Sequence, residues 1–331
     1  MMNVRRWKLW LLTAALVLSL CACGPKPPEK EILPEEPPAP DPVGFLDMEY
    51  PEMPVLSSQE EIASYMVYNF LRGELDMKFY VDREVGADYD ARFFVDNAQD
   101  SSGAYNAFLA YTADDRTITD LGDEEGYYVH FPVTYTHPHY DEEARAVAWA
   151  WVRDNPPPKG GFTDFETEKA YARAIHDFVA CRVTYDPKGY DPKGLNGANA
   201  YENFQEAYNV LGEGQETAVC AGYAHAFALI AQYAGINATW VRGNYMDDGS
   251  THAWNVVYPC DGSEPVTVDV TWDDDYSLDE PGQTEASDAY FYVPVSQDSG
   301  HEIVDNMLIL MNHVNTQQIE REEISPEDAM G

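Results

Sequence analysis

The segment TAVCAGYA, at residues 217–224, places Cys220 at the start of a predicted amphipathic helix. The first turn of a helix carries unsatisfied N–H groups and the positive end of the helix dipole. We therefore expect Cys220 to be favoured as a thiolate, beside N–H groups that can also bind an oxyanion. Gly235 follows as a helix-ending residue. The predicted buried face recurs at helical steps of four and three: Cys220, Ala224, Phe227, Ala231 and Ala234.

Two later segments supply partners for such a thiolate. HAWNVVY at residues 252–258 and VTVDVTW at residues 266–272 are predicted strands with turn residues between them. Folded as an antiparallel hairpin centred between residues 260 and 261, they put His252 directly opposite Asp269. A slip of one residue would separate the pair. This register predicts a nucleophile, a base and an orienting carboxylate.

Each of these residue types also has an ordinary structural role. A single buried Cys is more often a small core hydrophobe than a nucleophile. A Cys/His metal centre is the competing chemistry, but the segments lack the close ligand pairs of structural zinc. We predict no metal and no cofactor. We expect the acidic residues at 247–248 and 273–275 to be solvated.

The N-terminus has the features of a targeting signal. Basic residues at positions 5, 6 and 8 precede a mostly apolar run at 9–20 that is too short to span a bilayer comfortably. LCACG, at residues 20–24, then resembles a bacterial lipobox with Cys23 as the lipidated residue. We expect residues 1–22 to be a lipoprotein signal peptide, with a secretory signal or a short anchor as the alternative. Lipid on Cys23 would hold the mature chain on the extracytoplasmic face of the cell membrane.

Residues 23–54 are dense in Pro and Glu and predict an extended tether. The formal net charge is −38, and cleavage before Cys23 would remove three basic residues and no acid, leaving −41. This excess of negative charge argues against nucleic acid and anionic lipid surfaces as direct partners.

The rest of the chain divides at NPPPKGG, residues 155–161, because Pro and Gly clusters break helices. We expect an N-terminal α/β accessory domain at 55–155, a second domain at 160–295 and a C-terminal extension at 296–331. The predicted helices are residues 59–71, 104–112, 141–155 and 203–211, with a further helix capped by Thr163 and Glu166. The predicted strands are residues 79–81, 91–95, 127–133 and 291–293.

Three cysteines follow the signal region: Cys181, Cys220 and Cys260. Outside the cytoplasm an odd number leaves at least one free thiol. A disulfide between Cys181 and Cys260 would leave Cys220 as that thiol, although sequence alone does not give the pairing.

The segments around Cys220, His252 and Asp269 resemble the transglutaminase-like superfamily in its bacterial, cell-surface form. The similarity covers about residues 165–275, roughly a third of the chain. The resemblance implies an α+β, papain-like core, in which a helix carrying the Cys packs on an antiparallel sheet carrying His and Asp. The matching segments are residues 218–224, 235–236, 241–243, 252–257 and 268–272, with 175–178 and 185–186 upstream.

Carried over residue by residue, the resemblance implies that Cys220 is the nucleophile, His252 the general base and acid, and Asp269 the orienting residue. The implied reaction is acyl transfer through a Cys thioester, ending in hydrolysis or in transfer to a second amine. The implied substrate is a peptide or protein amide, with cell-wall peptide among the candidates. A non-catalytic peptide-binding module on the same fold is the alternative. Tyr185, Trp254 and Trp272 are expected either to line the cleft or to pack the core.

Overall fold

The computed structural model describes residues 40–85, 94–95, 98, 111–112, 116–122, 125–135, 138–185, 206–245, 251–274 and 286–303. The chain divides into two units, residues 1–36 and 37–331, and every described residue belongs to the second. The predicted signal peptide, Cys23 and most of the predicted tether lie outside the described residues. No helix among the described residues is long and apolar enough to cross a membrane.

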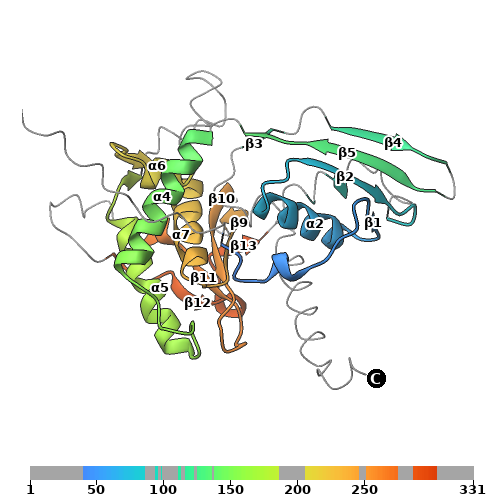
Figure 1. Cartoon of the computed structure of the whole chain (residues 1–331). Helices are drawn as coiled ribbons and strands as arrows, with labels where there is room; N and C mark the ends of the chain where they lie inside the picture. The colour runs from blue at the N-terminus through green and yellow to red at the C-terminus, as the bar shows by residue number, and fades with distance from the viewer. Residues whose placement is uncertain are drawn as a thin grey trace, which may run out of the picture. The chain divides into compact units, whose positions relative to one another are not determined.

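The N-terminal part of the described chain is a helix packed on a four-stranded sheet (Figure 1). Helix α2 (Gln59–Leu71) has the predicted bounds. Its start is capped twice, because Ser58 Oγ accepts from Glu61 N at 3.1 Å and Glu61 Oε2 accepts from Ser57 N at 2.6 Å. The predicted strands at 79–81 and 127–133 are confirmed. The strand order is β1 (Val55–Leu56), β2 (Asp76–Val81), β5 (Tyr127–Pro132) and β4 (Thr117–Asp120).

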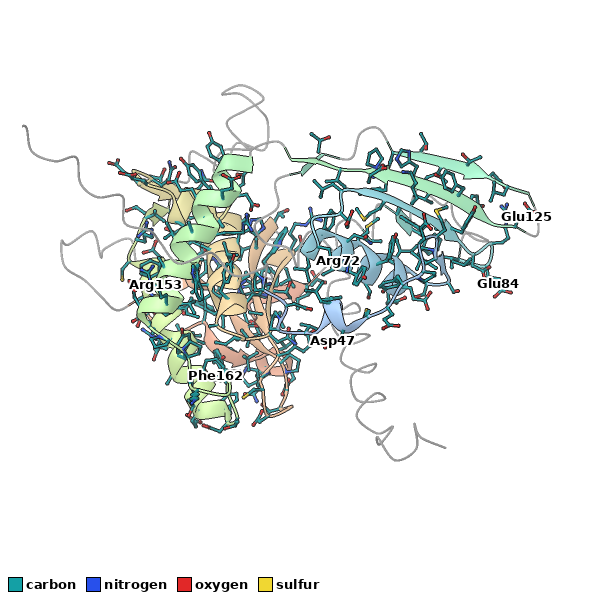
Figure 2. The ribbon with its side chains drawn as sticks, viewed as in Figure 1. Asp47, Arg72, Glu84, Glu125, Arg153 and Phe162 are labelled. Atoms are coloured by element: carbon teal, nitrogen blue, oxygen red, sulfur yellow. The ribbon has the colours of Figure 1, made fainter. Side chains whose placement is uncertain are left out.

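The core of this part includes residues from the segment predicted to be a tether. Val43 and Phe45, around the short 3-10 helix η1 (Phe45–Asp47), are buried with α2 and β2. The folded part of the chain therefore begins before residue 55. Charged residues such as Arg72, Glu84 and Glu125 stay exposed at its periphery (Figure 2).

Two predictions in this part are wrong where the structure tests them. Phe94 and Val95 are helical, not extended, because a short apolar run does not by itself distinguish helix from strand. Tyr111 and Thr112 end a predicted helix but form β3 (Tyr111–Thr112), paired with β6 (Thr134–Tyr135). Aromatic and β-branched residues favour such pairing. The remainder of both segments lies outside the described residues.

The C-terminal part is a five-stranded sheet covered by helices (Figure 1). Its central helix is α7 (Cys220–Tyr233), flanked by α4 (Pro138–Asp154), α5 (Phe165–Ala180) and α6 (Tyr208–Leu211). Strands β7 (Thr184–Tyr185) and β8 (Thr217–Ala218) pair in parallel before α7. The sheet order is β12 (Phe291–Pro294), β11 (Val266–Val268), β10 (Thr251–Val257), β9 (Ala238–Tyr245) and β13 (His301–Ile303).

This arrangement confirms the predicted α+β class and papain-like core, with a Cys-bearing helix on an antiparallel sheet. The predicted capping residue of α5 is wrong by one position, because Asp164, not Thr163, accepts the hydrogen bond from Thr167 N. The C-terminal stop of α7 is confirmed, since Gly235 has φ 83°. Helix α4 falls within the predicted accessory domain but packs in one core with α5 and α7 of the second domain. The proposed domain limits at residues 155 and 160 therefore stay predictions.

Strand β10 is buried on both faces. Val257 packs in the core around α7, whereas Trp254, Val256 and Tyr258 pack in the core around α2. The N-terminal part therefore covers the sheet face opposite the Cys-bearing helix, which explains why β10 is buried along nearly its whole length instead of at alternate residues.

The hairpin register differs from the predicted one by two residues. Asn255 pairs with Val268 and Val257 with Val266, so Trp254, not His252, lies across from Asp269. The second strand also ends at Val268, and α8 (Val270–Asp273) replaces its predicted end. The cause is Asp269, whose side chain caps α8 and ends the strand. A shift of two preserves the face, so Asp269 still reaches His252.

Candidate active site

Cys220 is the first residue of α7, as predicted. The N-cap residue Val219 makes no side-chain capping bond, and its carbonyl oxygen accepts from Gly222 N at 2.9 Å, so no side chain at the cap position competes for the N–H groups of the first turn. Cys220 is buried with Ala221 and Ala253, and the half-buried rings of Tyr185 and Trp240 pack against this group. The helix start therefore offers N–H donors and a positive dipole end directly beside a thiol.

His252 and Asp269 meet in the structure. His252 Nε2 lies 2.7 Å from Asp269 Oδ2, and Asp269 is fully buried. Burial alone would lower the pKa of His252, but the Asp269 carboxylate and hydrogen bonds to Asp269 and Cys220 raise it to about 10. Burial alone would raise the pKa of Asp269, but the two histidines beside it, His252 and His301, lower it to about 2. The pair is thus an imidazolium beside a carboxylate at neutral pH.

The orientation of the His252 ring follows from these contacts. Its Nε2 faces the carboxylate, which only accepts hydrogen bonds, so Nε2 carries a proton and Nδ1 is left for the thiol of Cys220. Trp272 stacks on the ring with centroids 4.8 Å apart and planes 11° apart. Asp269 and Trp272 therefore hold the ring with Nδ1 toward Cys220. Transfer of the thiol proton to the neutral ring would give a thiolate beside the imidazolium.

Strand β10 is fastened to the Cys-bearing helix by Asn255. Its Nδ2 donates to Ala224 O at 2.8 Å and to Thr239 O at 3.3 Å. Because Asn255 is fully buried, these bonds fix the height of α7 over the strand that carries His252. The local sequence around Asn255 does not predict this role.

The three aromatic residues predicted as cleft walls or core are placed differently. Trp254 is buried, 1% exposed, and lies within the core around α2. Trp272 and Tyr185 are half-buried, Trp272 on the His252 ring and Tyr185 beside Cys220. Of the three predicted residues, Trp272 and Tyr185 therefore lie at the surface of the site, where the half-buried ring of Trp240 joins them.

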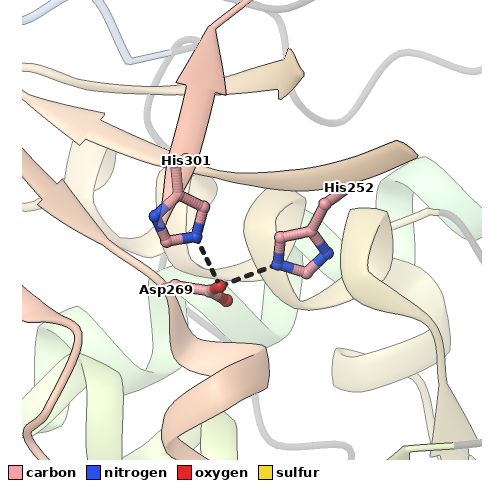
Figure 3. A group of neighbouring side chains, drawn as sticks. All are labelled: His252, Asp269 and His301. Carbon is pink, nitrogen blue, oxygen red and sulfur yellow. Dashed lines mark hydrogen bonds and ion pairs between the residues drawn. The ribbon is translucent and has the colours of Figure 1, made fainter. Parts of the chain in front are cut away.

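A second histidine joins the site that sequence reasoning did not find. His301, on β13, places Nε2 3.0 Å from the same Asp269 Oδ2 that binds His252 (Figure 3). Its Nδ1 lies 2.9 Å from Asp298 Oδ2. The only sequence signal is the spacing of Asp298 and His301, which lie 29 and 32 residues beyond Asp269, and that spacing alone predicts nothing specific.

A separate histidine cluster lies at the other end of α8. His176 is fully buried, with Nε2 3.2 Å from Asp273 Oδ2 and Nδ1 3.2 Å from Asp177 Oδ1. The expectation that residues 273–275 are solvated is wrong for Asp273 and Asp274, which are both buried. Asp274 lies 2.7 Å from the hydroxyl of Tyr223 on α7. Residues 247–248 and 275 lie outside the described residues.

Two further predictions concern metals and disulfides. His252, Asp269 and His301 offer three ligand atoms within 4.8 Å of one another, a set of nitrogen and oxygen donors that zinc accepts. The contacts of 2.7 and 3.0 Å between them are those of hydrogen bonds, which need protons that a metal would displace.

Cys181, Cys220 and Cys260 are free, so the Cys181–Cys260 disulfide considered from sequence is not formed.

The comparisons agree with this geometry. Residues 161–270 match the model of the transglutaminase-like superfamily. No curated protein matches the chain.

Solved structures resemble the chain only distantly. One described as a TGase is 15% identical, with 65% of this chain and 55% of that one covered and a TM-score of 0.30. The periplasmic domain of TgpA from Pseudomonas aeruginosa is 16% identical over 49% of this chain and 65% of that one, with a TM-score of 0.24. The chain thus spans little more than half of the first and under two thirds of the second.

Proposed function

We propose that the protein is a thiol hydrolase acting on a peptide or protein amide, and the match of residues 161–270 to the model of the transglutaminase-like superfamily supports this. The observation that carries the proposal is the joint arrangement of three groups. Cys220 begins α7, its side chain contributes to the raised pKa of His252, and Asp269 accepts from Nε2 of the His252 ring. Each group has the environment that its role requires.

In the first half of the proposed reaction, the Cys220 thiolate attacks the amide carbonyl carbon and forms the C–S bond. Developing negative charge on the carbonyl oxygen meets the N–H groups at the start of α7. The C–N bond then breaks, and the imidazolium of His252 gives a proton to the departing amine. The product is a thioester on Cys220.

In the second half, His252 takes a proton from water, whose oxygen attacks the thioester carbonyl. The C–S bond breaks, and the acid product leaves with the thiolate restored. A second amine in place of water would give transamidation through the same steps. We propose hydrolysis as the main outcome, because it needs no second bound substrate.

The proposed setting is the extracytoplasmic face of the cell membrane, through lipid on Cys23. The support is the lipobox-like LCACG at residues 20–24. A substrate in that setting would be a partner protein or a cell-wall peptide. Cys23→Ser should move the protein from the membrane fraction to the soluble fraction. Continued membrane attachment would contradict the proposed lipid anchor but not the proposed chemistry.

The test of the chemistry is the pH dependence of iodoacetamide alkylation at each cysteine, located by peptide mass spectrometry. Cys181 and Cys260 are internal references in the same molecule. Both are exposed, but partial desolvation and neighbouring acids raise the pKa of the Cys181 thiol, and partial desolvation with Glu168 raises the pKa of Cys260 to about 11. We expect Cys220 to react rapidly well below pH 8 while the references stay slow.

His252→Ala should slow the alkylation of Cys220, whereas His130→Ala, at a histidine on β5 outside the site, should not. Products are then sought in peptide libraries by mass spectrometry, which distinguishes a gain of water from a new amide. If Cys220 reacts like the references, and His252→Ala changes nothing, the hydrolase proposal fails and the peptide-binding module becomes the better account.

A further inference from the structure

Asp269 accepts hydrogen bonds from four groups. Oδ1 accepts from Thr271 N at 3.0 Å and from Trp272 N at 3.2 Å. Oδ2 accepts from Nε2 of His252 at 2.7 Å and from Nε2 of His301 at 3.0 Å (Figure 3). The two backbone bonds fix the plane of the carboxylate, and the two histidines share one oxygen. The proposed orienting residue thus has a second imidazole partner that the reaction does not require.

His301 is an imidazolium by its hydrogen bonding. Nε2 faces Asp269 Oδ2, and Nδ1 faces both oxygens of Asp298 at 2.9 and 3.0 Å. Carboxylates accept and do not donate, so both ring nitrogens must carry protons. Burial alone would lower the pKa of His301, but the two carboxylates raise it.

The surroundings of His301 hold it in place. Trp272 stacks on the His301 ring with centroids 4.4 Å apart, and the ring centroid of Trp254 lies 4.5 Å from that of His301. The titratable groups that face its ring among the described residues are Asp269, Asp298, the His252 ring at 5.8 Å and Tyr290 at 6.0 Å. Two negative charges and one positive charge therefore set its electrostatic environment.

We propose that His301 is a positioning residue for the Cys220–His252 pair, one that holds Asp269 Oδ2 toward His252 and balances part of the carboxylate's charge. This proposal rests on the proposed function. It gives the C-terminal strand β13, which lies outside the matched residues 161–270, a part in the chemistry.

The positive charge of His301 fixes the direction of the pH shift that the proposal predicts. A positive charge on His301, whose ring centroid lies 5.8 Å from that of His252, disfavours protonation of the His252 ring and of the thiol paired with it. Removing it should make both groups hold their protons to higher pH. The rising limb of Cys220 alkylation should then move to alkaline pH, and so should the titration of His252. A residue that merely filled space would leave both unchanged.

The experiment compares wild-type full-length protein with His301→Gln, which keeps a side-chain donor but has no charge. We expect the rising limb of Cys220 alkylation to move up by about one pH unit. NMR of histidine ring nitrogens should show His301 protonated at both nitrogens at neutral pH, and His252 titrating at higher pH in the variant. His130→Gln is the matched control and should leave both readouts at their wild-type values.

Four results would overturn the proposal: an unshifted alkylation limb in folded His301→Gln, an unshifted His252 titration, a neutral His301 ring, or stoichiometric zinc that is lost on substitution. If wild-type Cys220 reacts like Cys181, the proposed function fails, and the His252 titration still decides whether His301 acts on it. If His301→Gln does not fold, His301→Lys, which keeps a positive charge, must retain the wild-type limb.

Discussion

Two buried histidine clusters lie at opposite ends of the single turn α8, and both join imidazole to aspartates. His252 and His301 meet Asp269, which caps the start of α8, whereas His176 meets Asp273 at its end. Burial is complete for His176 and nearly so for His252. By hydrogen bonding and burial alone, the two clusters would rank equally as candidate sites.

What differs between the clusters is the partner of the second ring nitrogen. His252 has one nitrogen on a carboxylate and the other toward a thiol at the start of a helix. His176 has both nitrogens on carboxylates, Asp273 and Asp177, and Arg173 pairs with the second of these. A histidine whose two nitrogens both face acids has no acceptor site left for a substrate proton. Shifted histidine pKa values therefore identify a network of buried charges, whereas a neighbouring nucleophile is needed to identify a candidate active site.

The largest effect should come from exchanging one carboxylate in each cluster for an amide. In Asp269→Asn, the amide oxygen can still cap α8, but its NH₂ would face two protonated ring nitrogens and force His252 to turn or change tautomer. We expect Cys220 alkylation at neutral pH to fall about 10²- to 10⁴-fold. Asp273→Asn is the matched change, and its folded molecules should alkylate at the wild-type rate. Equal losses in both variants would erase the distinction between the clusters.

The next effect is on stability. His176→Gln removes a buried cation between Asp177 and Asp273 and should lower the free energy of unfolding by about 3 kcal/mol. Urea denaturation measures this loss, and Cys220 alkylation in the folded protein should remain at the wild-type rate. A stable variant with slow alkylation would mean that the His176 cluster acts on the chemistry.

The clusters also separate what sequence predicts from what it does not. Cys220 at a helix start follows from local periodicity, and the shared face of His252 and Asp269 from strand alternation, even though the register was two residues off. His301 and Asp298 are brought to Asp269 by pairing of β13 with β9, across more than fifty residues of chain. No local pattern encodes such a contact, and the cap that ends β11 at Asp269 competed with a plausible strand.

The pH dependence of stability should follow from all three histidines. The pKa of His252 is raised to about 10, and the pKa values of His176 and His301 are raised as well. A histidine with a raised pKa makes its full contribution to stability at pH values below its unfolded-state pKa of about 6.5. This contribution is lost as the pH rises through its folded-state pKa. The free energy of unfolding should therefore fall by a few kcal/mol at most between about pH 6.5 and 10.

Urea midpoints across this range test the sign. His176→Gln and His252→Gln should each lose less stability than wild type on going to alkaline pH, because each lacks one of the protons concerned. Titration of Tyr and Lys residues is common to all three proteins and cancels in the difference. Parallel curves would mean that neither histidine is charged in the folded protein.

The smallest effect should come from Gly243, which touches one cluster only. Gly243 on β9 pairs with His252 on one side and with Ile303 of β13 on the other. A Cβ there would meet Glu302 O at 2.1 Å and Trp254 Cη2 at 2.4 Å, so backbone would have to move. Gly243→Ala should cost about 1–3 kcal/mol and displace β13, the strand that carries His301.

Gly73→Ala is the matched control, since its φ of 71° disfavours alanine but no atom lies near its Cβ position. Both variants should lower the urea midpoint, but only Gly243→Ala should move the pH profile of Cys220 alkylation, and in the alkaline direction expected for loss of the His301 charge. If Gly243→Ala lowers stability without moving that profile, the coupling of β13 to the Cys220–His252 pair is too weak to distinguish the two clusters, and His301 would belong with His176 as a structural residue.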